Sequence, residues 1–230
     1  ESRPVHSSSR RCVRPPRGSA HSALRVIQAR DRWRLRRLAK RHPGLHIDPT
    51  ASSNLAVARF ELAPGAELRI GPSVSTERVA GALVFRVEPG GRIDVGEGTW
   101  LRTECEPIYL AAFDGARLTI GPESWLSGCH LSAKAGLTLG RGAWVGPGCR
   151  VFDADQHPLD ADRPERRAPV HLGERVWITP DVTILRGVRV GDHSVVGARS
   201  LVVRDVPPHS LAWGVPAEVR GRIGDRTDVR

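Results

Sequence analysis

One short polar stretch, Asp153-Ala-Asp155-Gln-His157-Pro-Leu-Asp160, places three acidic residues around a histidine. A neutral imidazole can accept a proton at pH 7, because the ordinary pKa of histidine is about 6.5. Such a base works best when a second group binds the other ring nitrogen and fixes its tautomer. Asp153 and Asp155 precede His157 by four and two residues, so either carboxylate could do this. The stretch predicts general acid–base chemistry, and the choice between the two carboxylates stays open.

The chain after this stretch follows a strict six-residue repeat. An aliphatic residue recurs at every sixth position, at Leu172, Ile178, Ile184, Val190, Val196 and Val202. A helix repeats its apolar face every 3.6 residues and a half-buried strand every two, so a period of six indicates short strands separated by sharp turns. Glycine follows the aliphatic residue at three of these positions, where a corner can use its freedom at positive φ. The repeat predicts the wall of a solenoid.

A second signature, aliphatic-x-aliphatic-Gly, extends the solenoid toward the N-terminus. Its glycines are Gly71, Gly96, Gly121, Gly140, Gly173 and Gly191, at spacings of 25, 25, 19, 33 and 18. Three hexads make 18 residues, so each interval is one three-sided coil plus an insertion, and the interval of 33 holds the largest. Stacked coils would pair equivalent strands in parallel about 4.8 Å apart. The largest insertion is the polar loop 152–169, and long loops on rigid scaffolds often carry function.

The positive charge of the chain is concentrated before the solenoid. The net charge is +10, and residues 1–45 contain 13 Lys or Arg against two acidic residues. The remaining chain is close to neutral, so nucleic-acid binding by the main domain is not indicated. Residues 1–21 are rich in Ser, Arg and Pro, and we expect them to be disordered.

Residues 22–44 predict a basic amphipathic helix. Its apolar stripe is Leu24, Ile27, Leu35 and Leu38. We interpret the helix as a cap over the open edge of the solenoid. The alternative is a weak contact with an anionic membrane surface through residues 22–41.

The four cysteines, Cys12, Cys105, Cys129 and Cys149, form no C-x-x-C pair. Their scatter argues against a zinc site and against a disulfide framework, and fits a reducing cytoplasm. No run of about 18 apolar residues is present, so no membrane span is predicted. We expect a cytoplasmic protein with no metal requirement.

Three motifs together resemble the hexapeptide-repeat acyltransferases, nearest in pattern to the maltose and galactoside O-acetyltransferases and related polysaccharide acetyltransferases. They are the loop stretch from Asp153 to Asp160, the Val176-Trp-Ile178 sequence after it, and the C-terminal pair Val202–Pro208 and Gly214–Ala217. The resemblance covers about residues 118–222. It implies an all-β fold, a left-handed parallel β-helix over residues 45–206 with a short cap over 207–230, and a homotrimer.

The resemblance also implies the activity and the sites. It implies transfer of acetyl from acetyl-CoA to a hydroxyl of a sugar or polysaccharide precursor, with His157 as general base and no acyl-enzyme. The expected cofactor contacts are Trp177, Thr179, Ala198, Arg204 and Arg220. The expected acceptor contacts are Lys134 and Asp160.

Two departures from the family pattern bear on these expectations. Thr179-Pro180 stand where the family has glycine and a small residue, so either the Thr179 amide faces the thioester oxygen or the cofactor is seated differently. Lys134 stands where sugar O-acetyltransferases have an acidic acceptor contact, which favours an anionic acceptor.

Other readings compete with an O-acetyltransferase. An N-acetyltransferase acting on an amino-sugar or nucleotide-sugar fits the same motifs, and a non-catalytic β-helix scaffold fits the repeats alone. A gamma-class carbonic anhydrase would need three zinc-binding histidines, and the solenoid lacks the close histidine pair of that family. DNA binding through the basic leader would be salt-sensitive.

Overall fold

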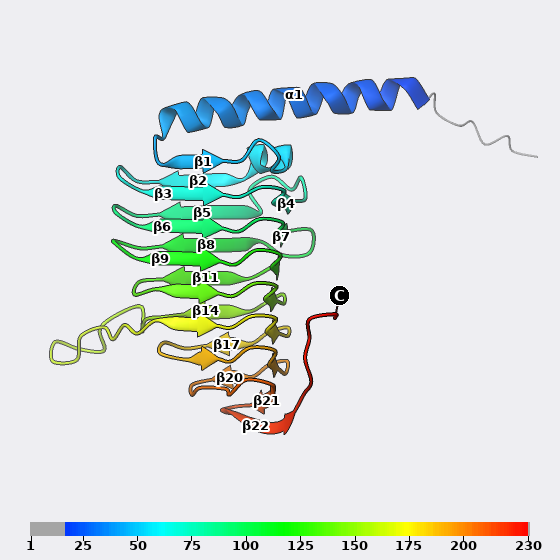
Figure 1. Ribbon diagram of the computed structural model, residues 1–230. Coiled ribbons are helices and arrows are strands. Elements are labelled where there is room, and N and C mark those ends of the chain that lie inside the picture. Colours follow the sequence, from blue (N-terminus) through cyan, green and yellow to red (C-terminus); the bar gives the residue numbers. More distant parts are fainter. Residues whose placement is uncertain (1–16, 230) are drawn as a thin grey trace, which may run out of the picture.

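The computed structural model describes residues 17–229, which form a triangular prism of stacked coils with a long helix across one end (Figure 1). Each coil contributes one strand to each of three sheets, in which successive coils pair in parallel. The fold is a left-handed parallel β-helix. The six-residue repeat predicted this architecture, because each hexad forms one side of a coil and places one aliphatic side chain inside the prism.

Apart from the antiparallel β22 at the end of sheet C, the strands of each sheet follow one another at intervals of one coil. Sheet A contains β1 (Leu45–Ile47), β3 (Glu67–Ile70), β6 (Arg92–Val95), β9 (Arg117–Ile120), β12 (Leu137–Leu139), β15 (Val170–Leu172) and β18 (Arg189–Val190). Sheet B contains β2 (Arg59–Leu62), β5 (Leu83–Val87), β8 (Ile108–Ala112), β11 (His130–Ala133), β14 (Arg150–Phe152), β17 (Thr183–Ile184) and β20 (Leu201–Val202). Sheet C contains β4 (Ser75–Thr76), β7 (Trp100–Arg102), β10 (Trp125–Ser127), β13 (Trp144–Val145), β16 (Trp177–Ile178), β19 (Val195–Val196), β21 (Ser210–Gly214) and β22 (Ala217–Arg222).

The core consists of columns of aliphatic side chains that run along the prism. In sheet A, Leu139 pairs with Leu172 and Leu172 with Val190, and all three are almost fully buried. Because register is in phase from coil to coil, the inward residue of each hexad always meets another inward residue. The result is a rigid wall that can hold side chains at fixed positions on its outer faces.

Helix α1 (Arg17–Arg41) lies over the first coil, next to the short 3₁₀ helix η1 (Ser53–Val57). It begins at Arg17 and ends at Arg41, whereas the sequence predicted a helix over 22–44, so residues 17–21 of the predicted disordered leader are helical. The rest of that leader, residues 1–16, lies outside the described residues.

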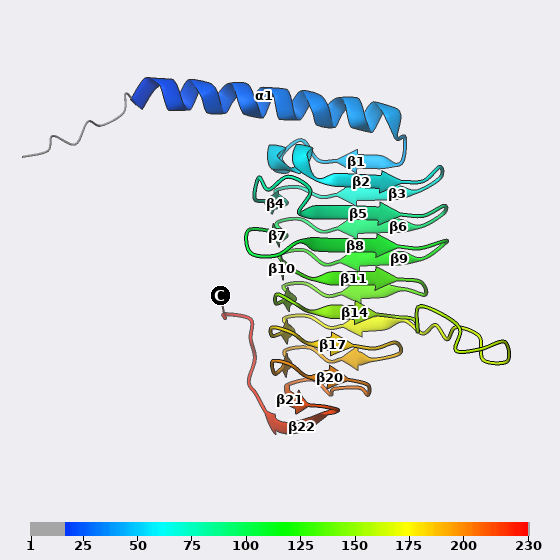
Figure 2. The same ribbon diagram turned by 180° about the vertical axis from the view of Figure 1, so that it is seen from behind.

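Only the C-terminal half of α1 packs as the predicted cap. Leu35 is buried, and so is Asp31, whose carboxylate pairs with Arg78 at 2.8 Å. Leu24 and Ile27 are exposed, because the first half of the helix extends beyond the prism (Figure 2). Only part of the predicted apolar stripe therefore packs against the prism.

Two segments leave the regular coils in the second half of the prism. The loop between β14 and β15 projects away from the body (Figures 1 and 2). The C-terminal segment forms the antiparallel pair β21–β22 and then returns along sheet C, where Arg226 lies beside two tryptophans of that sheet. The loop joins sheet B to sheet A and the tail lies on sheet C, so the two are at the level of the same coils but on opposite sides of the prism in both views (Figures 1 and 2).

Candidate functional site

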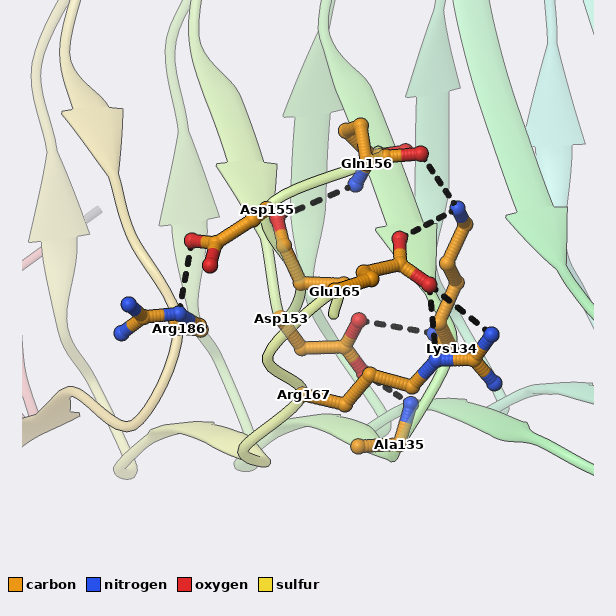
Figure 3. Close-up of polar contacts among 9 residues, drawn as sticks. Lys134, Ala135, Asp153, Asp155, Gln156, Glu165, Arg167 and Arg186 are labelled. Carbon is orange, nitrogen blue, oxygen red and sulfur yellow. Dashed lines mark hydrogen bonds and ion pairs between the residues drawn. The ribbon is translucent and has the colours of Figure 1, made fainter. Parts of the chain in front are cut away.

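Asp153 anchors the start of the loop to the preceding coil. Its side chain is fully buried, and one carboxylate oxygen accepts a hydrogen bond from the Lys134 amide at 2.7 Å. The other oxygen accepts from the amide of Ala135 at 2.8 Å (Figure 3) and from that of Gly136 at 2.6 Å. A buried carboxylate needs hydrogen-bond donors, and these three part-buried backbone N–H groups supply them. Both carboxylate oxygens of Asp153 accept hydrogen bonds from the preceding coil, and its expected role in orienting His157 stays a prediction.

Lys134 joins the two ends of the loop. Its Nζ donates to the Gln156 carbonyl oxygen at 3.0 Å and to Glu165 Oε1 at 2.6 Å, and only 13% of its side chain is exposed. Arg167 adds a second cation on Glu165 at 2.8 Å. The hydrogen bond from Lys134, more than that from Arg167, holds the pKa of Glu165 below its ordinary value. The Lys134 ammonium group is therefore already engaged by two acceptors within the loop, and its expected contact with an anionic acceptor substrate stays a prediction.

Asp155 forms a third brace. Its carboxylate pairs with Arg186 Nε at 2.7 Å, and Arg186 lies on the turn between β17 and β18 (Figure 3). Its backbone N–H also bonds to the Arg166 carbonyl oxygen at 3.0 Å, across the loop. Asp155 makes no recorded contact with His157 among residues 17–229, so the structure brings neither candidate carboxylate to the imidazole.

His157 itself is exposed and open. Within the described chain its imidazole meets no hydrogen-bonding or ionic partner. The residue before it, Gln156, has φ of 72°, a left-handed conformation that costs energy outside glycine, and its carbonyl is the one that Lys134 holds. The histidine is thus positioned through its backbone, while both ring nitrogens stay available.

Asp160 lies farther out on the loop and shapes its turn. Its carboxylate bonds to the backbone and side chain of Arg163, with Nε at 2.7 Å, and this contact lowers the pKa of Asp160. The carboxylate is exposed. Its expected acceptor contact stays a prediction.

The outer face of sheet C carries four tryptophans in register. They are Trp100, Trp125, Trp144 and Trp177, with successive ring centroids 5.0, 5.7 and 6.3 Å apart. Trp177 points outward as predicted, and it is 38% exposed. It belongs to this ladder, and beside the ladder lies a cavity of about 280 Å³ that Pro147 and Pro180 also line. Three of the four tryptophans were not predicted at the site.

The corner between sheets C and B presents three stacked dipeptides. They are Gly146-Pro147, Thr179-Pro180 and Gly197-Ala198, which follow the paired residues Val145, Ile178 and Val196. The Thr179 amide donates to the Val196 carbonyl oxygen at 3.1 Å, and its hydroxyl donates to the same oxygen at 2.6 Å. The Thr179 amide therefore cannot face a thioester, which corrects that expectation.

Ala198 offers what Thr179 does not. The second residue of each stacked dipeptide is Pro147, Pro180 or Ala198. Proline has no N–H, so only Ala198 carries an amide proton at this position. Ala198 is exposed, and among residues 17–229 no acceptor is recorded for that N–H. The corner thus presents one free donor beside the cavity.

The expected arginines lie near the end of the prism. Arg204 is exposed and makes no recorded pair within residues 17–229, and Arg220 pairs with Glu218 at 2.9 Å. Arg226 was not predicted, since the tail has no repeat. Its guanidinium lies 5.5 Å from the Trp144 ring and 5.3 Å from the Trp177 ring, and burial lowers its pKa.

Other reactive groups are placed away from the loop. Cys129 and Cys149 are buried inside the prism, and burial raises the pKa of both thiols, that of Cys149 to about 11. Among residues 17–229, no three His, Cys, Asp or Glu side chains are grouped so as to hold a metal ion. No helix in the same residues is long and apolar enough to cross a membrane.

The chain is similar to several curated acetyltransferases and to one nodulation protein. It is 39% identical to nodulation protein L of Rhizobium meliloti strain 1021 over 136 residues, which cover 56% of this chain and 69% of that protein. It is 31% identical to the galactoside O-acetyltransferases of Lactococcus lactis and Escherichia coli K12 over 137 residues, 57% of this chain and 64% of each of them. The chain therefore spans just under two thirds of the length of these two enzymes.

Comparison of structures agrees with the fold. The polySia-specific acetyltransferase NeuO superposes with a TM-score of 0.57 at 22% identity, covering 75% of this chain and 79% of that chain. At this identity the match shows a shared fold. No protein-family model matches the chain. The identity to nodulation protein L over more than two thirds of its length, together with the coils and the interrupting loop, shows that the chain belongs to the hexapeptide-repeat acetyltransferase family.

Proposed function

We propose that this chain transfers acetyl from acetyl-CoA to a hydroxyl group of a sugar or polysaccharide precursor. The observation that carries the proposal is the exposed imidazole of His157. It lies on a loop that is held to the rigid wall by contacts of Asp153, Lys134 and Asp155. A loop held so firmly around a free base suits a catalyst better than a scaffold. The names of the curated relatives, galactoside O-acetyltransferases, support a sugar hydroxyl as the acceptor.

In this proposal His157 acts as the general base. Its imidazole removes the proton of the acceptor hydroxyl while the oxygen attacks the acetyl carbonyl. When the tetrahedral intermediate collapses, the C–S bond breaks and the CoA thiolate takes the proton from the imidazolium. No cysteine of the described chain lies in the loop, so transfer is direct and needs both substrates bound together.

The corner beside the tryptophan ladder is the proposed seat of acetyl-CoA. Trp177 offers an apolar surface to the pantetheine arm, and Ala198, without a large side chain, lets that arm approach the wall. The free Ala198 N–H is the proposed donor to the carbonyl oxygen, in place of Thr179. Arg204 and Arg220 are the proposed cations for the phosphates, with Arg226 as a further candidate.

The projecting loop supports a homotrimer. His157 meets no described residue that could fix its tautomer, and the loop extends away from its own prism (Figure 1). A neighbouring subunit would supply both the missing partner and a second wall for the cofactor. Sedimentation of the protein at micromolar concentration should give the mass of three chains; a monomer would contradict the shared site.

The proposal is tested by following CoA thiol release from acetyl-CoA over a panel of sugars, nucleotide-sugars and amino-sugars. His157→Ala should lower turnover by roughly 10²–10⁴ with little change in acetyl-CoA affinity. His171→Ala is the matched control, because His171 is exposed on sheet A outside the loop. Near-normal turnover in His157→Ala would refute the general base. A preference for amines would reassign the enzyme to N-acetylation.

A further inference from the structure

The outer face of α1 is exposed and carries a regular stripe. Its members, spaced four, three, four and three residues apart, are Val26, Arg30, Trp33, Arg37 and Lys40. Trp33 lies two residues from both buried positions, Asp31 and Leu35, and two residues turn a helix by about 200°. The stripe therefore faces away from the prism. Val26 is 68% exposed and Trp33 55% exposed, both large apolar groups in contact with solvent.

The same helix is strongly cationic. Residues 22–41 contain eight Lys or Arg side chains, and every one of them is exposed. Their single acidic residue, Asp31, is buried and already paired with Arg78. A solvated surface helix is usually stabilised by acidic and basic residues four apart, and these residues have no exposed acid to supply such pairs. The charges repel one another unless an anionic surface meets them.

The position of α1 makes its outer face accessible to a flat surface. The helix lies across the end of the prism with its first half beyond the body, and in both views the described chain lies on one side of it (Figures 1 and 2). A plane can therefore contact the helix along its whole length.

The apolar members of the stripe distinguish a membrane from a soluble polyanion. An indole prefers the boundary between headgroups and acyl chains, where its ring is apolar and its N–H is solvated. In α1 the Arg37 guanidinium lies 4.8 Å from the Trp33 ring, so cation and indole form one patch. A soluble polyanion would neutralise the positive charges but would leave Val26 and Trp33 exposed to water.

We propose that α1 docks this protein on an anionic membrane surface. The helix lies flat, with Trp33 in the headgroup region and with Arg30, Arg37 and Lys40 against anionic lipid headgroups. Its inner face stays on the first coil, so docking needs no unfolding of the cap. This attachment is independent of the acetyl transfer proposed above, because the loop with His157 lies several coils away.

The test is co-sedimentation of the full chain with phosphatidylcholine vesicles containing about 30% phosphatidylserine, against vesicles of phosphatidylcholine alone. Binding is expected only to the anionic vesicles and should weaken as salt is raised. The triple variant Arg30→Gln, Arg37→Gln, Lys40→Gln should bind roughly 100-fold more weakly, since each cation near such a surface contributes about 1 kcal/mol. Trp33→Ala should reduce binding further at every salt concentration, because it removes the apolar anchor.

A matched control separates the helix from net charge. The triple variant Arg69→Gln, Arg117→Gln, Arg189→Gln removes three exposed arginines from the outer face of sheet A and should bind almost as well as the parent. Equal losses in the two triple variants would overturn the proposal, and so would absence of binding to anionic vesicles. Binding to duplex DNA or dextran sulfate without binding to vesicles would also overturn it and would assign α1 to a polymer.

Discussion

The wall of the prism and the loop that leaves it are stabilised by different means. In the wall, parallel pairing repeats coil after coil, and each buried aliphatic residue contacts others like it above and below. The loop is fixed to the coils by three sets of side-chain contacts: Asp153 with three amides, Lys134 with Glu165, and Asp155 with Arg186. The first region spreads its stability over many equivalent contacts, as solenoids do. The second concentrates it in a few groups.

This difference suits the two tasks that we propose. A wall of equivalent coils offers a long, even surface for an extended cofactor. A base must instead be held at one point, and a few strong polar contacts fix one conformation. Single substitutions should therefore change the stability of the loop more than that of the wall, whereas a substitution on the wall matters most where it removes a group that contacts the cofactor.

The largest effect is expected from Asp153→Ala. The substitution removes a fully buried carboxylate and leaves three part-buried backbone N–H groups without their acceptor, so unfolding should become easier by about 1–3 kcal/mol. Acetyl transfer should be lost with the position of His157. Denaturant unfolding and the thiol-release assay measure the two effects. Asp162→Ala, at an exposed loop position, is the control. If both variants were equally stable, the anchoring role of Asp153 would be wrong.

On the wall, Ala198→Pro tests the free amide. Pro147 and Pro180 occupy the same place on neighbouring coils, so the backbone there accommodates proline, and the substitution chiefly removes one N–H. If that donor faces the developing oxyanion, turnover should fall by about 10²–10³ while the fold is unchanged. Ala198→Gly keeps the N–H and should retain most activity. Equal turnover in the proline and glycine variants would exclude the amide from the reaction.

The repeats were enough to predict the wall and the location of the loop. Burial alone decides which residue of each hexad points inward, and burial can be read from aliphatic spacing. The stacking of the four tryptophans could also have been predicted from the sequence. Trp100, Trp125, Trp144 and Trp177 are separated by 25, 19 and 33 residues, the spacings of the glycines that mark the coils. Each tryptophan follows its glycine by four residues, so stacking the coils stacks the indoles.

The polar contacts of the loop could not be predicted in this way. Asp153 lies close to His157 in sequence, but the turn at Lys134, Ala135 and Gly136 in the preceding coil offers it three amides. Which partner a buried carboxylate takes depends on backbone groups brought together by the register of two coils. The same holds for the Thr179 amide, which the next coil engages through Val196. The exposed tail has no repeat, so Arg226 left no signal.

A smaller effect is expected from Lys134→Met. Lys134 holds the carbonyl of Gln156, directly before His157, so its loss should shift the imidazole without removing it. Turnover should fall by roughly 10–100-fold, and KM for acetyl-CoA should stay nearly constant because the wall is untouched. Steady-state kinetics separate these quantities. Lys40→Met, which removes an exposed lysine from α1, is the control. A rise in KM with unchanged turnover would instead indicate direct contact with a substrate.

The smallest effect is a pH dependence of the Lys134–Glu165 contact. Lys134 lowers the pKa of Glu165, so the contact contributes fully above the ordinary glutamate value of about 4.3 and is lost as the pH falls through the lowered value. The loop should thus remain closed near neutral pH and loosen only in acid, by about 1–2 kcal/mol. Hydrogen exchange of amides 154–168 between pH 3 and 6, corrected for intrinsic rates, measures this loosening. Glu165→Gln should show less protection at pH 6 and a weaker pH dependence. If parent and variant lost protection in parallel, the loop would depend on Asp153 and Asp155 alone.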